Sequence, residues 1–395
     1  MAESHEGAAL VVTWMMREGR HMTHMREFGD EMCRRIVTAG IPIWRAFCST
    51  RTLHPEVYAT AYVWRRDQPG AERLTALHGF QNSEGIASSP IMAVEKSGIA
   101  IRRRLHDPNC PMDFPVLAEF KNAGGADYIA MPLKYSSGQI NCITWATDRA
   151  GGFTDAEVDG LTEVAEALAV IVEVQSTRRI ASHLMDTYVG HRTGERVLSG
   201  AIQRGAALTI HAVIWFCDLR GFTALADSLP GDRLIAMLND YFEAVVTSVV
   251  GEGGEALKFM GDGLLAIFEL AENEEPSARC GAALRAASVA AEKIAARNLE
   301  RRATGEPEIR FGLALHLGEV NYGNIGAPNR LDFTVIGPAV NHAARLEKIA
   351  SELGRPVVTS ASFAAAAKSS FESLGRHHLR GVREPQEVFA PISET

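Results

Sequence analysis

The alternation of hydrophobic and polar positions divides the chain into regions with different periods. Residues 22–38 carry hydrophobic side chains at steps of three and four, as an amphipathic helix does. Four later stretches are rich in β-branched and aromatic residues and predict strands, at 57–64, 73–77, 128–133 and 140–147. A helix, several strands and a closing helix predict an α+β domain of the sensor kind over residues 1–153.

A long helix is predicted to close this domain. Thr154 followed by Glu157 fits a capping box, in which each side chain satisfies a free backbone N–H group at the start of a helix. Hydrophobic residues then recur at helical steps at positions 161, 164, 168 and 171. This seam could pair two copies of the chain, or it could pack on its own domain, and periodicity does not choose between them. Residues 154–209 are therefore predicted to be a signalling helix and a polar, glycine-punctuated connector.

The period changes again in residues 210–395. Strands are expected at 212–216, on both sides of residues 261–263, and at 309–316, 333–336 and 356–359. Helices are expected at 232–250, 277–299 and 338–353. The order β-α-β-β-α-β predicts a ferredoxin-like sheet covered by helices on one face.

Composition limits the classes of function. A chain of 395 residues has room for two or three domains, and a net charge of −8 without a basic patch argues against nucleic-acid binding.

The best candidate for a membrane span, residues 164–174, contains two glutamates and is shorter than the roughly 18 apolar residues needed. We expect a soluble, cytoplasmic protein with no membrane partner. His54, His78 and His106 are scattered without paired spacing, so no ligand role is assigned to them.

Two aspartates are candidates for metal binding. Asp218 closes an apolar strand, where a carboxylate is costly to desolvate unless a cation or hydrogen-bond donors compensate it. Asp262 lies in the turn between two predicted strands. Taken alone, Asp218 is more simply a turn residue, and the Asp-Gly pair at 262–263 is a common hairpin signal. If the two strand ends are neighbours, however, their carboxylates could jointly hold a divalent cation.

Asn341 and Arg345 are four residues apart on a predicted helix, so both side chains emerge on one face. A guanidinium beside an amide could grip a polyphosphate or a ribose oxygen. The alternative is a solvated helix face on which Arg345 pairs with an acid.

Three segments together, FCDLRGFT (216–223), KFMGDGLLAIF (258–268) and TVIGPAVNHAARLE (334–347), resemble the catalytic domain of class III adenylate and guanylate cyclases. The resemblance covers residues 210–392. It implies a homodimer of catalytic domains joined head to tail, in which each composite site takes its metal-binding aspartates from one copy and its base-binding and transition-state residues from the other.

The resemblance also implies a role for each residue. Asp218 and Asp262 would bind two Mg²⁺ or Mn²⁺ ions that activate the ribose 3′-hydroxyl and hold the triphosphate. Asn341 would orient the ribose, and Arg345 would stabilise charge on the α-phosphoryl group. Gly221, Phe222 and Thr223 would contact the substrate beside the aspartates.

Lys258 and Thr334 would face the base, and a lysine donor with a hydroxyl suits adenine. The resemblance therefore implies an adenylate cyclase that converts ATP to 3′,5′-cyclic AMP and pyrophosphate. A guanylate cyclase, or a degenerate domain that only binds a nucleotide or a partner, is the alternative. Thr334 is similar to the residue of bicarbonate-responsive cyclases, and bicarbonate sensitivity is a hypothesis.

Three positions leave the phosphate contacts open. Arg220 stands where a small or neutral residue is more usual in the family, and either Arg380 or Arg383 could contact the distal phosphates.

The N-terminal half resembles a GAF-type sensor in its order of elements, which implies an unknown small-molecule regulator.

Overall fold

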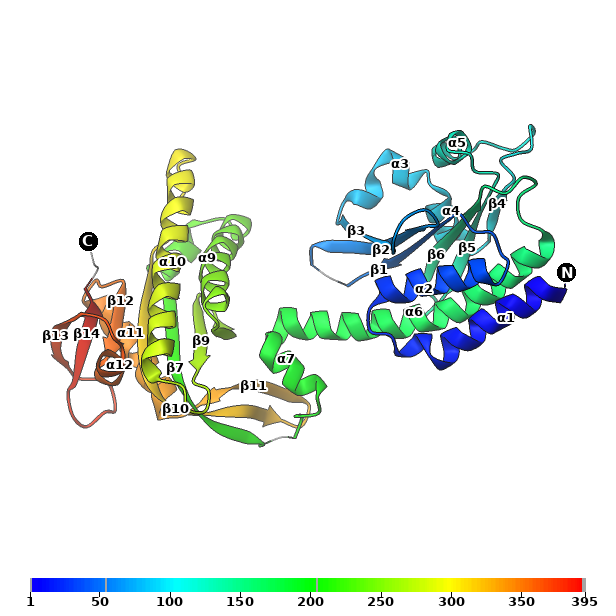
Figure 1. Cartoon of the computed structure of the whole chain (residues 1–395). Helices are drawn as coiled ribbons and strands as arrows, with labels where there is room; N and C mark the ends of the chain where they lie inside the picture. Colours follow the sequence, from blue (N-terminus) through cyan, green and yellow to red (C-terminus); the bar gives the residue numbers. More distant parts are fainter. Residues whose placement is uncertain (1, 54, 204, 393–395) are drawn as a thin grey trace. The chain divides into compact units, whose positions relative to one another are not determined.

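The computed structural model describes residues 2–53, 55–203 and 205–392, so His54 lies outside the described residues. The chain divides into two compact units, Met1–Leu184 and Met185–Thr395 (Figure 1). Each unit has its own buried core and is described by itself.

The N-terminal unit is built on a six-stranded antiparallel sheet in the order β3-β2-β1-β6-β5-β4. Its strands are β1 (Arg45–Arg51), β2 (Val57–Arg65), β3 (Glu72–Leu77), β4 (Ile101–Arg103), β5 (Asp127–Lys134) and β6 (Ile140–Thr147). The four predicted strands are confirmed as β2, β3, β5 and β6. The sequence pattern missed β1 and β4, because β1 mixes charged and small polar residues and β4 has three residues.

Helices cover both faces of this sheet. One face packs against α1 (Ala2–Arg17), α2 (Met25–Thr38) and the first part of α6 (Asp155–Val189). The other face packs against α4 (Pro90–Ser97) and α5 (Pro115–Asn122), and the short elements α3 (Glu84–Ala87), η1 (Gly19–His21) and η2 (Phe80–Asn82) complete the unit. The layers are visible in Figure 1, and the expected α+β domain is confirmed as such, with α1 as an unpredicted addition.

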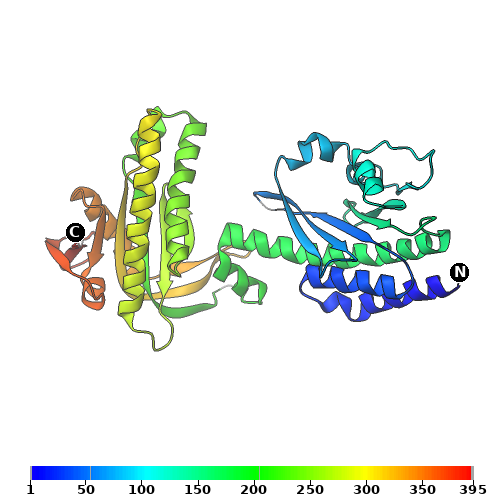
Figure 2. The same ribbon diagram turned by 45° about the horizontal axis from the view of Figure 1, so that its top comes forward.

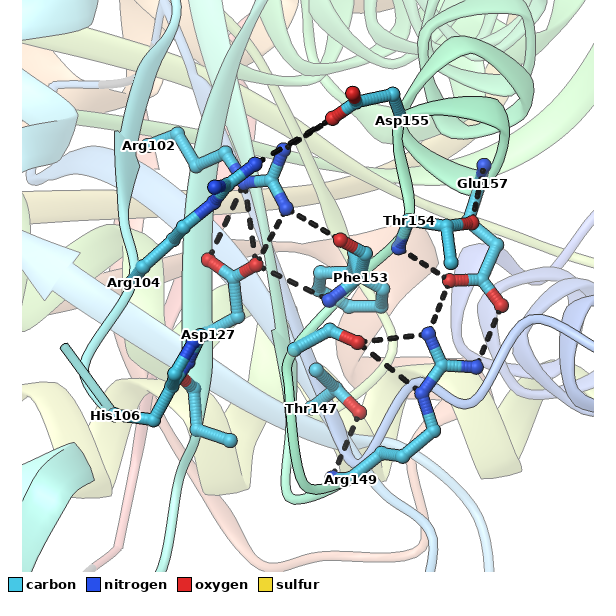
Figure 3. A network of polar contacts seen from close by, with 12 residues as sticks. Arg102, Arg104, His106, Asp127, Thr147, Arg149, Phe153, Thr154, Asp155 and Glu157 are labelled. Atoms are coloured by element: carbon cyan, nitrogen blue, oxygen red, sulfur yellow. Dashed lines mark hydrogen bonds and ion pairs between the residues drawn. The ribbon is translucent and has the colours of Figure 1, made fainter.

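The start of α6 is fixed by the predicted capping box. The Thr154 N–H donates to the Glu157 carboxylate at 2.8 Å, and the Glu157 N–H donates to the Thr154 hydroxyl at 3.3 Å. Figure 3 shows the surrounding network, in which Arg102 binds the fully buried Asp127 at 2.8 Å and also reaches Asp155 at 3.3 Å. These contacts tie the first turn of α6 to the sheet of its own unit.

The hydrophobic seam of α6 is buried inside the N-terminal unit. Its members all belong to the core that includes α1 and α2: Leu161, Val164, Leu168 and Ile171. The structure thus favours packing on its own domain over pairing of two copies through these residues. Helix α6 runs without interruption to Val189 and then gives way to α7 (His191–Leu198), so the helix takes up most of the segment predicted as a signalling helix and connector.

The C-terminal unit contains the predicted β-α-β-β-α-β order, as β7-α9-β8-β9-α10-β10. Its sheet follows the order β13-β14-β12-β10-β7-β9-β8, and β11 pairs with the far part of β10. The strands are β7 (Ala207–Leu219), β8 (Glu255–Met260), β9 (Gly263–Glu269), β10 (Phe311–Ala327), β11 (Arg330–Ile336), β12 (Val357–Ser360), β13 (Phe371–His377) and β14 (Gln386–Pro391).

Its helices lie on both faces of the sheet. They are α8 (Phe222–Ser228), α9 (Gly231–Gly251), α10 (Pro276–Ala303), α11 (Pro338–Glu352) and α12 (Ala361–Ala366). Helices α9 and α10 run side by side over one face, as Figure 2 shows, whereas α11 packs on the opposite face of β7 and β10. The prediction of helices on one face therefore holds for the βαββαβ core and is wrong for α11.

Helix α9 is the one described helix with the length and apolar composition that crossing a membrane would require. Residues 164–174, the candidate span identified from the sequence, belong to α6. In the structure, Met237, Tyr241, Val245 and Val249 of α9 are buried against the sheet and α10. This is the packing of an amphipathic core helix.

Candidate active site

Asp218 and Asp262 converge at one end of the sheet. Asp218 lies near the end of β7, opposite Gly312 of β10, and Asp262 occupies the tight turn between β8 and β9. The Asp218 Oδ1 atom lies 3.3 Å from where a Cβ on Gly263 would stand, and the two carboxyl groups are within hydrogen-bonding reach. The hairpin turn expected as the simpler explanation for Asp262 is present, and it is the turn that brings this carboxylate to Asp218.

The electrostatics of this pair suit a hard cation. Burial, and then the hydrogen bond and charge of Asp262, raise the pKa of Asp218 to about 7. The carboxylates of Asp218 and Asp262 together provide oxygen ligands of the kind that Mg²⁺ and Mn²⁺ prefer, and a bound cation would favour the ionised form of Asp218. The residues present therefore fit the divalent ions that the sequence predicts.

Arg220 forms an ion pair with a buried glutamate. Its Nη1 atom lies 2.8 Å from Oε1 of Glu347 on α11, and the Glu347 side chain is only 7% exposed. The guanidinium crosses β10 at Gly312, where a Cβ would stand 1.7 Å from Nη2. The charge of Glu347 acts on Asp218, so Arg220 neutralises a third carboxylate next to the pair. Glu347 was not among the predicted site residues, although it stands two residues after Arg345.

Lys258 and Thr334 line one cavity of about 720 Å³, as expected for residues that face the same ligand group. Lys258 Nζ contacts Asp332 Oδ2 at 2.5 Å across the β8–β11 side of this cavity. Asp332 also lines it, and it had not been predicted. The period of a strand could have identified it, because Asp332 lies two residues before Thr334 on β11, and residues two apart on a strand share a face.

Asn341 and Arg345 line a separate groove of about 700 Å³ together with His342 and Arg383. Of the two candidate arginines near the C-terminus, Arg383 and not Arg380 is among the residues lining this groove. Among the residues that the structure describes, Arg345 makes no ion pair, so the alternative in which it pairs with an acid is wrong.

The segment after Asp218 turns into a short helix. Gly221 has a left-handed backbone conformation, with φ 73°, and directly precedes α8. The Phe222 ring packs partly into the core, whereas Thr223 is exposed. In this segment a ligand could reach the backbone and Thr223 more readily than the ring of Phe222.

A single chain therefore presents three partial sites. The aspartates form one, the Lys258–Thr334 cavity a second and the Asn341–Arg345 groove a third. Neither Asp218 nor Asp262 is among the residues lining the cavity or the groove. A carboxylate pair for metal, a cavity with a lysine and a hydroxyl, and a cationic groove together provide the chemistry of a nucleoside triphosphate site.

Residues 208–390 match the family model of the adenylate and guanylate cyclase catalytic domain, and this segment is such a domain. The aspartate pair, Lys258, Thr334, Asn341 and Arg345 all lie within it.

Two curated relatives are similar to the chain. An adenylate cyclase of Anabaena cylindrica is 33% identical over 165 residues, which is 41% of this chain and 32% of the relative. Adenylate cyclase 1 of Rhizobium meliloti (strain 1021) is 28% identical over 257 residues, which is 62% of this chain and 38% of the relative. The chain thus spans only 32% and 38% of the length of these relatives.

Two solved structures are also similar. The adenylyl cyclase CyaB from P. aeruginosa is 25% identical with a TM-score of 0.45, covering 48% of this chain and 97% of the other. The guanylyl cyclase Cya2 is 23% identical with a TM-score of 0.42, covering 48% and 95%.

Proposed function

We propose that the C-terminal unit is a metal-dependent adenylate cyclase that converts ATP to 3′,5′-cyclic AMP and pyrophosphate. The observation that carries the proposal is the convergence of Asp218 and Asp262 from separate strand ends. Further support comes from the two relatives named adenylate cyclase.

In this proposal, Asp218 and Asp262 hold two Mg²⁺ or Mn²⁺ ions. When bound, these ions lower the pKa of the ribose 3′-hydroxyl and neutralise the triphosphate. Arg345, which makes no ion pair with any residue that the structure describes, donates hydrogen bonds to the α-phosphoryl oxygens as their charge changes. Asn341, one turn earlier on α11, orients the ribose so that the 3′-oxygen lies in line with the phosphorus.

The base enters the cavity lined by Lys258 and Thr334. The Lys258 ammonium donates to N1 of adenine, and the Thr334 hydroxyl accepts from the 6-amino group. To donate this hydrogen bond, the Lys258 ammonium must leave Asp332 or contact the base and Asp332 together. The Lys258–Asp332 ion pair is half-exposed and therefore weak.

The complete site requires a second copy of the chain. The aspartates of one copy would face the cavity and the groove of the other, since one chain keeps these groups apart. Two large hydrophobic side chains that line the cavity, Phe259 and Leu331, are exposed, and a second copy would cover them.

Mixing variants tests both the chemistry and the dimer. Cyclic AMP formation is measured with Mn²⁺ and with Mg²⁺ for Asp218→Asn, for Arg345→Ala, and for a mixture of the two allowed to exchange subunits. Each variant alone is expected to lose activity, and the mixture should recover up to about a quarter of it, because half of the dimers have one intact composite site.

The matched control mixes Asp218→Asn with Asp262→Asn, which damage the same half of the site and should not restore activity. Recovery in the control would contradict the composite site. Absence of any cyclic nucleotide from the unmodified protein with either metal would contradict the enzyme and favour a module that only binds nucleotide.

A guanylate cyclase is the second candidate, and Asp332 is the observation that favours it. This carboxylate lines the same cavity as Lys258 and could accept hydrogen bonds from N1 and the 2-amino group of guanine. Comparison of kcat/KM for ATP and GTP decides between the two, and a higher value for GTP would overturn the adenylate assignment.

For the N-terminal unit we propose a GAF-like regulatory role in a cytoplasmic protein. The supporting observation is that the network of Figure 3 ties the start of α6 to the sheet through Arg102 and Asp127. Arg102→Met would loosen this attachment and should alter the cyclase rate while circular dichroism stays unchanged. An unchanged rate would contradict the regulatory link.

A further inference from the structure

Besides Arg345 and Arg383, the groove lined by Asn341 contains a third basic side chain, that of His342. Its imidazole ring stacks on that of His316 from β10, with the ring centres 4.4 Å apart and the planes inclined by 23°. Within the described part of the chain, no hydrogen bond of the His342 ring is found, so its nitrogen atoms are available to a ligand in the groove.

The charges around His342 are all basic or neutral. Arg345 is one turn away on α11, Arg383 lines the groove from the loop before β14, and His316 lies beneath the ring. His316 is held by the hydroxyl of Ser360, at 2.8 Å from Nδ1. None of the described residues that line the groove carries a carboxylate. A concave surface with two arginines and no acid is suited to an anion of high charge, such as a polyphosphate.

We propose that His342 is a further substrate-binding residue, which takes up a proton when the polyphosphate of the nucleotide enters the groove beside Arg345 and Arg383. This inference rests on the proposed function and deepens it, because it names a polyphosphate contact that neither the motifs nor the family match assigns.

The surroundings explain why protonation follows binding. In the free protein, burial and then the charge of Arg345 lower the pKa of His342, and burial and His342 lower that of His316 to about 3. Both rings are therefore neutral near pH 7. A bound polyphosphate places several negative charges next to His342 and reverses the electrostatic balance in favour of the imidazolium. Its second nitrogen then donates a charge-assisted hydrogen bond to a phosphate oxygen.

The sign of the pH dependence follows from linkage. Because the bound state holds one more proton than the free state, affinity rises as pH falls, by up to about tenfold per pH unit between the free and bound pKa values of His342. The phosphate groups of the nucleotide also titrate, so the contribution of His342 is the difference between the protein and a variant in which this residue cannot ionise.

Titration calorimetry on the full chain measures the uptake directly. The probe is 3′-deoxy-ATP with Mg²⁺, which lacks the attacking hydroxyl and is not consumed, titrated in two buffers of different ionisation enthalpy. We expect the unmodified protein to take up close to one proton more per bound nucleotide than His342→Gln does. His342→Arg, which carries a permanent charge, should bind at least as tightly as the unmodified protein but with the smaller uptake of the Gln variant.

The matched control is His211→Gln, which removes an exposed histidine from β7 outside the groove and should leave the uptake unchanged. Equal proton uptake by the unmodified protein and His342→Gln overturns the proposal. Inorganic tripolyphosphate is titrated in parallel, and if it shows the same difference while no cyclic nucleotide is ever formed, the cyclase proposal fails and the role of His342 stands. Failure of both probes to bind overturns the role of His342.

Discussion

The ion pair between Arg220 and Glu347 depends on the absence of a side chain at Gly312. A Cβ added there would stand 1.7 Å from Arg220 Nη2 and 2.1 Å from its Cζ, and the three nearest atoms all belong to this guanidinium. Gly312→Ala must therefore displace Arg220. Since the arginine side chain is flexible, the expected cost is that of the broken ion pair rather than of a backbone clash.

The structure sets the magnitude of this cost. Glu347 is 7% exposed and Arg220 is 21% exposed, so the displaced arginine can reach water but the carboxylate cannot. Removal of one partner of a buried pair costs about 3–5 kcal/mol, and the partial exposure of Arg220 favours the lower end, about 3 kcal/mol. Arg220→Ala should cost a similar amount, because it leaves the same carboxylate unpaired.

A double-mutant cycle in urea unfolding tests this reasoning. In the Arg220→Ala background the atoms that Gly312→Ala would strike are gone, so the second substitution should change the free energy of unfolding by less than about 1 kcal/mol. The double variant is thus expected to be about as stable as Arg220→Ala alone. If Gly312→Ala costs the same in both backgrounds, the space at Gly312 serves something other than the ion pair, and the argument is refuted.

Three further outcomes are expected. Burial opposes ionisation of Glu157, but hydrogen bonds from Arg149 and the backbone outweigh it and lower the pKa of this carboxyl. Glu157→Gln should therefore destabilise the N-terminal unit by about 2 kcal/mol at pH 7, and by progressively less as the pH falls below the ordinary pKa of a glutamate and through the lowered one, as measured by thermal unfolding. The Glu255 carboxylate accepts hydrogen bonds from the Tyr322 hydroxyl at 3.0 Å and from the Thr193 N–H of α7, and Glu255→Gln replaces it with an uncharged amide. Hydrogen exchange in α7 should become faster in this variant, and unchanged exchange would argue against the contact. Asp332→Asn removes a half-exposed ion pair, so stability should change by less than about 1 kcal/mol while the ratio of kcat/KM for ATP and GTP shifts.

The places of the candidate site residues within their own elements could be predicted from the sequence, because each stands in a short local pattern, whereas their roles follow only from the family resemblance and stay predictions. Asp218 and Asp262 were recognisable at the ends of strands, and Asn341 and Arg345 at one helical step. The capping box at Thr154 was equally local, and its two hydrogen bonds are present. Such features depend on backbone geometry over a few residues, so spacing along the chain is sufficient to predict them.

Contacts between distant segments were decided only by the tertiary structure. Arg220 and Glu347 are 127 positions apart, and no pattern in either segment reveals that a glycine on a third element lets them meet. The ion pair of Asp332 with Lys258 and the stacking of His342 on His316 also join segments that are far apart in the chain, so no local pattern predicts them. The periodicity of α6 showed a hydrophobic face but not what covers it, because burial depends on which surface another segment of the chain presents.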